Sequence, residues 1–180
     1  MHTDLTGKSA IVTGGSRGYG AGIARALQVR AARVWITGRN AEALERTAGE
    51  LGVQSLQADV TSAADWDRVC DAVREAAGQI DILVNNAGAG VRIAPLTDLT
   101  DAEIEQVLAV NLTGAILGCR RVAPTMSEQG AGTIVNVSSV CQDQAWPGFS
   151  VYSAAKAGLA QLSKCLYTEL RASGVRVTTV

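Results

Sequence analysis

The chain has 180 residues, of which 47% are hydrophobic and 18% are charged, and its formal net charge is −1. This is the composition of a folded globular domain that is long enough to bury one sizeable core. Because its Lys and Arg residues are scattered rather than clustered, the charge pattern argues against a nucleic-acid partner and against an anionic membrane surface.

Apolar runs alternate with amphipathic helical patterns along the whole chain. We expect strands over residues 9–13, 33–37, 54–57, 82–85, 133–137 and 175–180, and helices over residues 20–29, 41–51, 63–77, 102–127 and 152–173. Most of the strand runs carry Val and Ile on consecutive positions, which is typical of parallel strands buried on both faces. Their alternation with helices predicts an α/β fold, a doubly wound parallel sheet of the Rossmann type, in a single domain over residues 1–180.

Few sequence features indicate the compartment or metal chemistry. The N-terminus lacks the pattern of a signal peptide, and no apolar stretch reaches the length of a membrane span. The cysteines at positions 70, 119, 141 and 165 form no C-x-x-C pair, which predicts reduced thiols in a cytoplasmic protein. The only histidine is His2, so a histidine general base, a Ser-His-Asp hydrolase and a His-ligated zinc site are not expected.

The segment TGGSRGYG, residues 13–20, follows the first expected strand and opens the first helix. Its glycines permit a tight turn and a close approach of the backbone to a ligand. The N-terminus of the next helix presents free N–H groups and a positive dipole end, which suit a pyrophosphate. A plain strand-to-helix turn is the alternative, but this context is the one that dinucleotide binding requires. The cofactor contacts expected in this segment are Gly14, Ser16, Arg17, Gly18, Tyr19 and Gly20.

The end of the second expected strand indicates which nicotinamide nucleotide binds. NAD enzymes usually carry an acid there for the ribose hydroxyls, but this chain reads VWITGRN, with Arg39 and no acid. Arg17 is a second cation in the glycine segment. Because a guanidinium matches a 2′-phosphate through bidentate charge-assisted hydrogen bonds, the pair favours NADP(H) over NAD(H). Two solvated surface arginines are the alternative.

The segment YSAAK places Tyr152 and Lys156 four residues apart, on one face of the last expected helix. A surface pair, or a Tyr that caps a packed helix, is the alternative for such a common spacing. An ordinary phenol is a sluggish acid at neutral pH, but a neighbouring ammonium lowers the pKa of such a group, toward the range in which general acid–base catalysis works best. In a chain with this one histidine, the pair is the most credible acid–base couple.

Taken in order, these motifs resemble those of the short-chain dehydrogenase/reductase family, in its non-extended branch. The resemblance covers nearly the whole chain and rests on TGxxxGxG at 13–20, ADV at 58–60, NNAG at 85–88, Asn111, the serine pair at 138–139 and the Tyr-x-x-x-Lys of YSAAK. It implies a Rossmann-fold oxidoreductase that acts on CH–OH groups and interconverts a ketone and a secondary alcohol with a nicotinamide cofactor.

The resemblance also implies a role for each matching residue. Tyr152 would exchange the proton with the substrate, and Lys156 would bind the nicotinamide ribose and assist the phenol. Ser139 would orient the carbonyl oxygen, with its neighbour Ser138 as the alternative assignment. Asn111 would hold a water that links Lys156 to solvent. The remaining implied cofactor contacts are Asp59, Val60, Asn86, Ala87 and Gly88.

Several residues keep two interpretations. Asp81 is either a strand-entry residue or a helper near the adenine, and the segment 146–149 is either a wall of the substrate pocket or core packing. A nucleophilic role for Cys141 has little support, because no general base adjoins it in sequence. Ala31 stands where the family usually has glycine, and costs about 1 kcal/mol if the backbone there is left-handed.

The family resemblance also predicts a continuation beyond Val180, because in that family a Pro-Gly turn, a substrate-covering loop, a helix and an edge strand follow. We therefore expect a C-terminally truncated form. The alternative function is a non-catalytic dinucleotide-binding or subunit-interaction protein. The expected partners are a small carbonyl or alcohol substrate and further copies of the chain, as a homodimer or homotetramer through the helices expected over 102–127 and 152–173.

Overall fold

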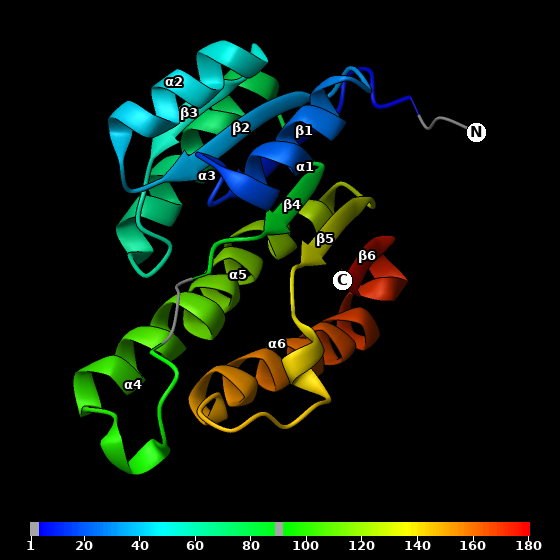
Figure 1. The fold of residues 1–180 in the computed structure, drawn as a ribbon. Helices are drawn as coiled ribbons and strands as arrows, with labels where there is room; N and C mark the ends of the chain where they lie inside the picture. Colours follow the sequence, from blue (N-terminus) through cyan, green and yellow to red (C-terminus); the bar gives the residue numbers. More distant parts are fainter. Residues whose placement is uncertain (1–3, 89–91) are drawn as a thin grey trace.

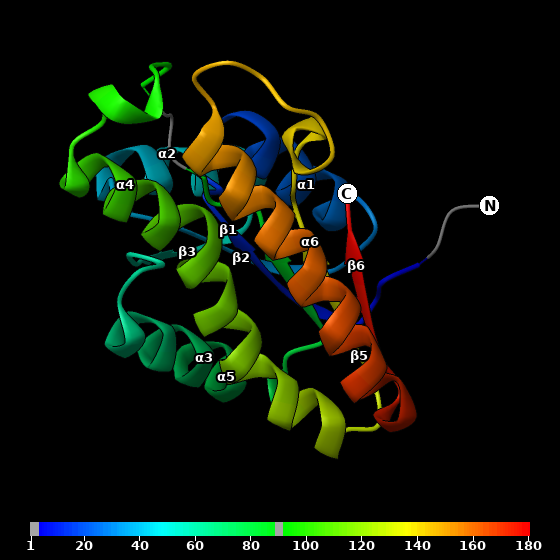
Figure 2. The same cartoon turned by 90° about the horizontal axis from the view of Figure 1, so that it is seen from below.

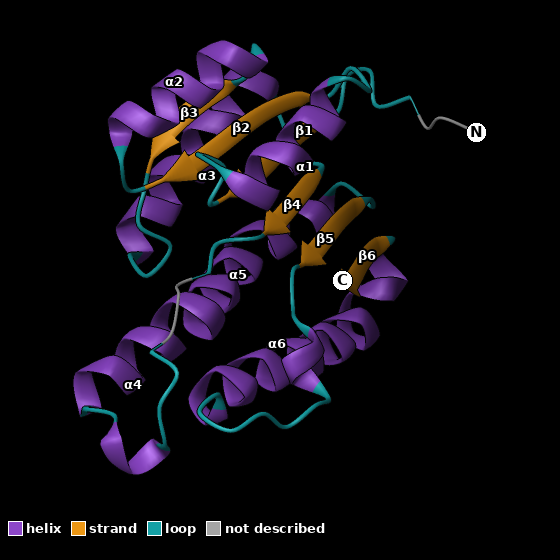
Figure 3. Ribbon diagram, viewed as in Figure 1, coloured by secondary structure: helices purple, strands orange, loops and turns teal. Residues whose placement is uncertain are grey.

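The computed structural model describes residues 4–88 and 92–180, so His2 lies outside the described residues. Six parallel strands form one sheet in the order β3-β2-β1-β4-β5-β6, and Figure 3 shows them pointing the same way. The strands are β1 (Ser9–Thr13), β2 (Arg33–Gly38), β3 (Gln54–Gln57), β4 (Ile82–Asn85), β5 (Gly132–Asn136) and β6 (Val175–Thr179). The helices are α1 (Gly18–Gln28), α2 (Ala41–Leu51), α3 (Ala63–Ala77), α4 (Asp101–Leu108), α5 (Gly114–Glu128) and α6 (Ser150–Leu170).

Helices cover the sheet on both sides, as predicted (Figures 1 and 2). Alternate residues of a strand point to opposite faces, so Ile11 of β1 packs under α3, α5 and α6, while Ala10 and Val12 pack under α1 and α2. All three side chains are fully buried. In the described part of the chain, no helix is long and apolar enough to cross a membrane. The doubly wound parallel sheet expected from the sequence is therefore confirmed.

The helix expected over residues 102–127 is wrong as one continuous helix. Its backbone follows α4 to Leu108, passes through a π-helical turn at Ala109–Thr113, and continues as α5. Within that turn the Asn111 side chain donates through Nδ2 to the Val107 carbonyl, 3.0 Å away. A side chain that bonds a carbonyl four residues back competes with the regular helical ladder, and such turns are frequent at functional sites.

The other corrections are shifts of element ends. α1 begins two residues earlier than expected and α6 begins at Ser150 and ends at Leu170, where a 3-10 turn follows. Gly78 ends α3 in the left-handed conformation, which glycine adopts without steric cost. Ala31 also lies in the left-handed region, at φ +67°, so the cost expected for alanine at this position is present.

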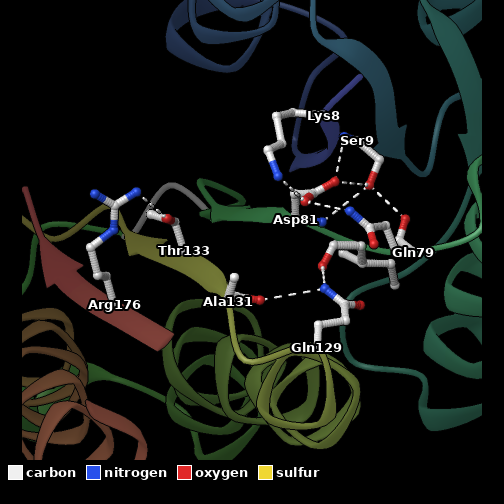
Figure 4. Close-up of polar contacts among 9 residues, drawn as sticks. Lys8, Ser9, Gln79, Asp81, Gln129, Ala131, Thr133 and Arg176 are labelled. Carbon is white, nitrogen blue, oxygen red and sulfur yellow. Dashed lines mark hydrogen bonds and ion pairs between the residues drawn. The ribbon is translucent and has the colours of Figure 1, made fainter. Parts of the chain in front are cut away.

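Asp81 lies at the amino end of β4, where it joins the entries to β1 and β4 (Figure 4). Its carboxylate accepts from Lys8 Nζ and from the Ser9 backbone N–H, each at 2.9 Å, and from Gln79 Nε2 at 2.8 Å. Burial alone would raise the pKa of Asp81, but the hydrogen bonds from Ser9 and the Lys8 ammonium hold it below the usual value. Since ligands of open α/β sheets bind at the carboxyl ends of the strands, Asp81 is a strand-entry residue, which decides between its two interpretations.

Candidate active site

A cleft of about 960 Å³ opens at the carboxyl ends of the strands, and its wall contains every site residue expected from the sequence. The cleft runs from the glycine segment, past the ends of β2 and β3, to the first turns of α6. The residues that the sequence did not single out as contacts, although they line the cleft, are Gly38, Asn40, Ala43, Ala58, Val110, Val137 and Val140. Most of these adjoin a predicted residue in sequence, which is the one signal that could have found them.

The glycine segment is held against the loop after β4 by hydrogen bonds around Thr13 and Asn86. The backbone N–H groups of Asn86 and Ala87 both donate to Thr13 Oγ1 at 3.0 Å, and Asn86 Nδ2 donates to the Thr13 carbonyl at 2.8 Å. A Cβ placed on Gly20 would lie 2.6 Å from Asn86 Nδ2 and would overlap the Gly14 carbonyl oxygen. This junction therefore has no room for a side chain at position 20.

The N-terminus of α1 is open toward the cleft. Its N-cap residue, Arg17, is extended and supplies no side-chain cap, and the first turn contains no acid. By contrast, Asn40, Ser62 and Thr100 each cap the helix that follows them with a side-chain oxygen. The uncapped N–H groups and the helix dipole give α1 an anion-binding end.

Two guanidinium groups stand at the same end of the cleft. Arg17 and Arg39 are both exposed and line the cleft, and within residues 4–88 and 92–180 neither side chain forms a hydrogen bond or ion pair. Their backbones are positioned by neighbours, because Thr47 Oγ1 donates to the Ser16 carbonyl at 2.8 Å and Gln57 Nε2 donates to the Arg39 carbonyl at 2.9 Å. The cations are thus fixed at the backbone while their heads stay available to an anion.

The loop after β3 is fixed by its own side chains. Asp59 Oδ1 accepts from the Thr61 N–H at 2.9 Å and from its hydroxyl at 2.8 Å, while Trp66 Nε1 donates to the Val60 carbonyl at 2.9 Å. Asp59 and Val60 therefore present a preformed wall to the cleft.

Tyr152 and Lys156 lie in the first two turns of α6, close together. Lys156 Nζ lies over the Tyr152 ring, 5.7 Å from its centroid, and donates to the Val137 carbonyl at 2.9 Å. Lys156 is buried, and burial lowers the pKa of its ammonium. The surface-pair interpretation of YSAAK therefore does not describe this lysine.

The serine pair is divided by its hydrogen bonds. The Ser138 hydroxyl donates to the Lys156 backbone carbonyl at 3.2 Å, whereas Ser139 Oγ accepts from the Cys141 N–H at 3.2 Å. Ser139 thus keeps its own hydroxyl proton available to the cleft, which favours it over Ser138 as the donor to a ligand. Cys141 is buried, and its sulfur forms no hydrogen bond with the described residues.

Asn111 is almost wholly buried beside the loop after β4. Its Oδ1 has no hydrogen-bond partner in the described part of the chain, and it lies 3.0 Å from the place that a Cβ of Gly88 would take. An unpaired buried carbonyl oxygen is costly, so this atom marks a position that suits a donor such as a water.

A chain of buried side chains, which sequence reasoning missed, anchors α6 to the sheet. Asn85 Nδ2 donates to Asn136 Oδ1 at 2.8 Å, Asn136 Nδ2 donates to Ser163 Oγ at 2.8 Å, and Ser163 donates to the Leu159 carbonyl at 2.9 Å. The main partner of the Asn85 side chain is thus another side chain and not a backbone group. Ser163 follows Lys156 on the same helix, α6.

Comparison with known proteins decides the family. The sequence model of the short chain dehydrogenases matches residues 8–180. The chain belongs to the short-chain dehydrogenase family. This membership confirms the resemblance drawn from the motifs, and it makes the chain an oxidoreductase of the family that acts on CH–OH groups with NAD(P).

This short-chain dehydrogenase aligns over nearly its whole length with relatives that are longer than it is. D-threitol dehydrogenase of Mycolicibacterium smegmatis is 40% identical, with 98% of this chain and 69% of that protein aligned. 2-(R)-hydroxypropyl-CoM dehydrogenase of Xanthobacter autotrophicus is 41% identical, with 95% of this chain and 72% of that protein aligned. A metagenomic short-chain oxidoreductase solved in complex with NADP has a TM-score of 0.94 and 36% identity, over 98% of this chain and 82% of that one.

Three observations indicate that the cleft of this short-chain dehydrogenase suits an anionic dinucleotide. The N-terminus of α1 is uncapped, two guanidinium groups lack partners among the described residues, and the junction at Gly20 leaves the backbone bare. These groups are the donors that a pyrophosphate and a further phosphate require.

Proposed function

We propose that the chain is an NADP(H)-dependent oxidoreductase that interconverts a ketone and a secondary alcohol, with Tyr152 as proton donor and acceptor. The observation that carries this proposal is the position of the Lys156 ammonium over the Tyr152 ring, on the wall of the same cleft that the glycine segment opens. The nicotinamide, when bound, supplies or accepts the hydride. Everything else in the reaction falls to side chains of this chain.

In the proposed mechanism Tyr152 gives its proton to the carbonyl oxygen. The Lys156 ammonium beside the ring stabilises the negative charge left on the phenol oxygen. The Ser139 hydroxyl donates a hydrogen bond to the same substrate oxygen. This bond stabilises the negative charge that develops there, as an oxyanion-binding group does. The unpartnered Oδ1 of Asn111 holds a water that returns protons from solvent by way of Lys156.

Turnover tests the Tyr152 assignment directly. Tyr152→Phe keeps the ring and removes the hydroxyl, so we expect at least a 100-fold loss of kcat in NADPH-dependent ketone reduction. Tyr167→Phe is the matched control, because Tyr167 is exposed on the same helix outside the cleft. Equal rates for Tyr152→Phe and the wild type would end the assignment.

The cofactor proposal rests on Arg17 and Arg39, and the NADP bound by a similar solved protein supports it. Arg39→Asp replaces a phosphate donor with an acid suited to ribose hydroxyls. We expect the preference, measured as the ratio of Kd for NADPH and NADH, to shift at least tenfold toward NADH. Arg46→Asp is the control, since Arg46 is exposed on α2 outside the cleft. An unchanged ratio for Arg39→Asp would remove Arg39 from the phosphate site.

The second candidate is a dinucleotide-binding or subunit-interaction protein without turnover. It predicts NADPH binding by calorimetry together with no oxidation of NADPH by any ketone. We further propose a single cytoplasmic domain that assembles as a homodimer or homotetramer through α5 and α6. Light scattering of the purified protein tests the assembly, and a monomer would refute it.

A further inference from the structure

Two loops flank Tyr152 on the side of the cleft away from the arginines. The loop over residues 92–100 and the loop over residues 139–149 contact each other, because the Ala94 N–H donates to the Gly148 carbonyl at 3.4 Å. A Cβ on Gly148 would also lie 2.8 Å from Ile93 Cγ2. Gly148 and Tyr152 line one small cavity together with Leu99, so both loops adjoin the proposed proton donor.

These loops expose large apolar side chains to solvent. Ile93 is 65% exposed, Val140 is 66% exposed and Trp146 is 51% exposed. Val140 lies on the wall of the cleft itself. We call Ile93, Val140 and Trp146 the apolar rim. Of the two sequence interpretations of residues 146–149, core packing fails for Trp146, since half of its surface faces solvent.

The same loops offer no cation for an anionic substrate. Arg92 is the only basic residue over 92–100 and 139–149. Glu103 already binds its guanidinium at two positions, Nε–Oε1 at 2.8 Å and Nη2–Oε2 at 3.2 Å, and its Nη2 also donates to the Asp98 carbonyl. Arg17 and Arg39, whose guanidinium groups have no partner in the described part of the chain, line the opposite end of the cleft.

We infer that the substrate is an uncharged ketone or secondary alcohol with a bulky apolar body, which packs on the apolar rim while its carbonyl meets Tyr152 and Ser139. This inference rests on the proposed function and narrows its substrate. It disfavours polyols, which would leave the rim exposed to water, and it disfavours carboxylates and sulfonates, which would find no free cation on the two loops. A substrate that buries ~60 Å² of apolar surface on the rim gains about tenfold in affinity.

A panel of three ketones with the full chain tests the inference. It contains 2-decalone as the apolar ketone, dihydroxyacetone as the hydroxylated one and acetoacetate as the anionic one. We expect kcat/KM for 2-decalone to exceed both others at least tenfold. Ile93→Ser and Trp146→Ser should each lower the ratio of kcat/KM for 2-decalone to that for dihydroxyacetone by about fivefold to tenfold. Val29→Ser is the control, because Val29 is even more exposed, at 74%, but lies at the end of α1 outside the cleft.

A binding measurement separates failure of this inference from failure of the proposed function. Trp146 is the exposed tryptophan, whereas Trp35 and Trp66 are buried, so a blue shift of its fluorescence reports an apolar ligand on the rim. A shift with 2-decalone and none with dihydroxyacetone supports the inference even if no ketone is reduced. Reduction of the panel without preference for 2-decalone would overturn it. It would also be overturned if the rim variants change the oligomeric state in light scattering but leave the ketone ratio unchanged, because the rim would then be a contact between subunits.

Discussion

Gly20 offers the sharpest test of the dinucleotide site, because it can be changed without touching a charge. In Gly20→Ala the new methyl would overlap the Gly14 carbonyl oxygen and lie 2.6 Å from Asn86 Nδ2, where ordinary contact begins at 3.4 Å. The methyl group must therefore displace the glycine segment, the Asn86 side chain, or both. Either shift breaks the bond from Asn86 Nδ2 to the Thr13 carbonyl.

The size of the effect follows from that geometry. A displacement on the order of 1 Å in a positioned site can cost about 100-fold, and a lost hydrogen bond costs about 1 kcal/mol, or roughly fivefold. We therefore expect the Kd of Gly20→Ala for NADPH to rise about 10- to 100-fold. The free energy of unfolding should change less than the free energy of NADPH binding, because the glycine segment lies at the surface of the cleft.

Calorimetric titration with NADPH is the assay, and Gly22→Ala is the matched control on the same helix. A Cβ on Gly22 would meet nothing within 4 Å, so that variant should bind NADPH like the wild type and gain up to about 1 kcal/mol of helix stability. Thermal unfolding of both variants shows that each is folded. Wild-type NADPH affinity in a folded Gly20→Ala would refute the proposed approach of the nucleotide to this segment.

Three further predictions concern stability. Ala31→Gly should raise the free energy of unfolding by about 0.5–1 kcal/mol, since φ is +67°, while Gly52→Ala, at φ +65° with open space around it, should lower it by a similar amount; urea titration in which the two variants change in the same direction would contradict this. The lowered pKa of Asp81 means that the ionised carboxylate stabilises the fold above the unfolded pKa near ~4 and that this contribution is lost as the pH falls through the lower folded pKa. The stability gap between wild type and Asp81→Asn, on the order of 1 kcal/mol at pH 7, should therefore close in acid, and a gap independent of pH would count against it. Asn136→Leu removes the main acceptor of Asn85 Nδ2 and the donor to Ser163 Oγ, so it should cost about 1–3 kcal/mol in urea titration; wild-type stability would show that these two hydrogen bonds contribute nothing.

The sheet could be predicted because its information is local. Runs such as AIV at 10–12 and ILV at 82–84 are short, apolar on consecutive positions and rich in Val and Ile, and this pattern favours strands buried on both faces. The π-helical turn could not be predicted in the same way. The apolar pattern continues through it, and the competing bond from Asn111 to Val107 depends on a rotamer that the sequence does not specify.

The site residues likewise fall into those that local motifs predict and those that depend on the folded structure. The position of the cleft was predicted from the glycine segment, from the arginine after β2 and from the YSAAK spacing. The family resemblance added Asn111 and the serine pair. All of these residues line the cleft. Groups that belong to no motif were missed. The Val137 carbonyl that receives Lys156, and the pairing of Asn136 with Ser163, join segments 19 and 27 residues apart. Such contacts exist only once the sheet has placed β5 beside α6.

The two ends of the parallel strands have different roles in this protein. The hydrogen bonds of Asp81 join the strands at their amino ends, while every group proposed to contact a ligand lies at their carboxyl ends, a full strand length away. Selection can therefore change the stability to heat or acid through residues at the amino ends of the strands while it changes coenzyme and substrate preference through residues at their carboxyl ends. The two adaptations interfere little with each other, because distant sites contribute independently.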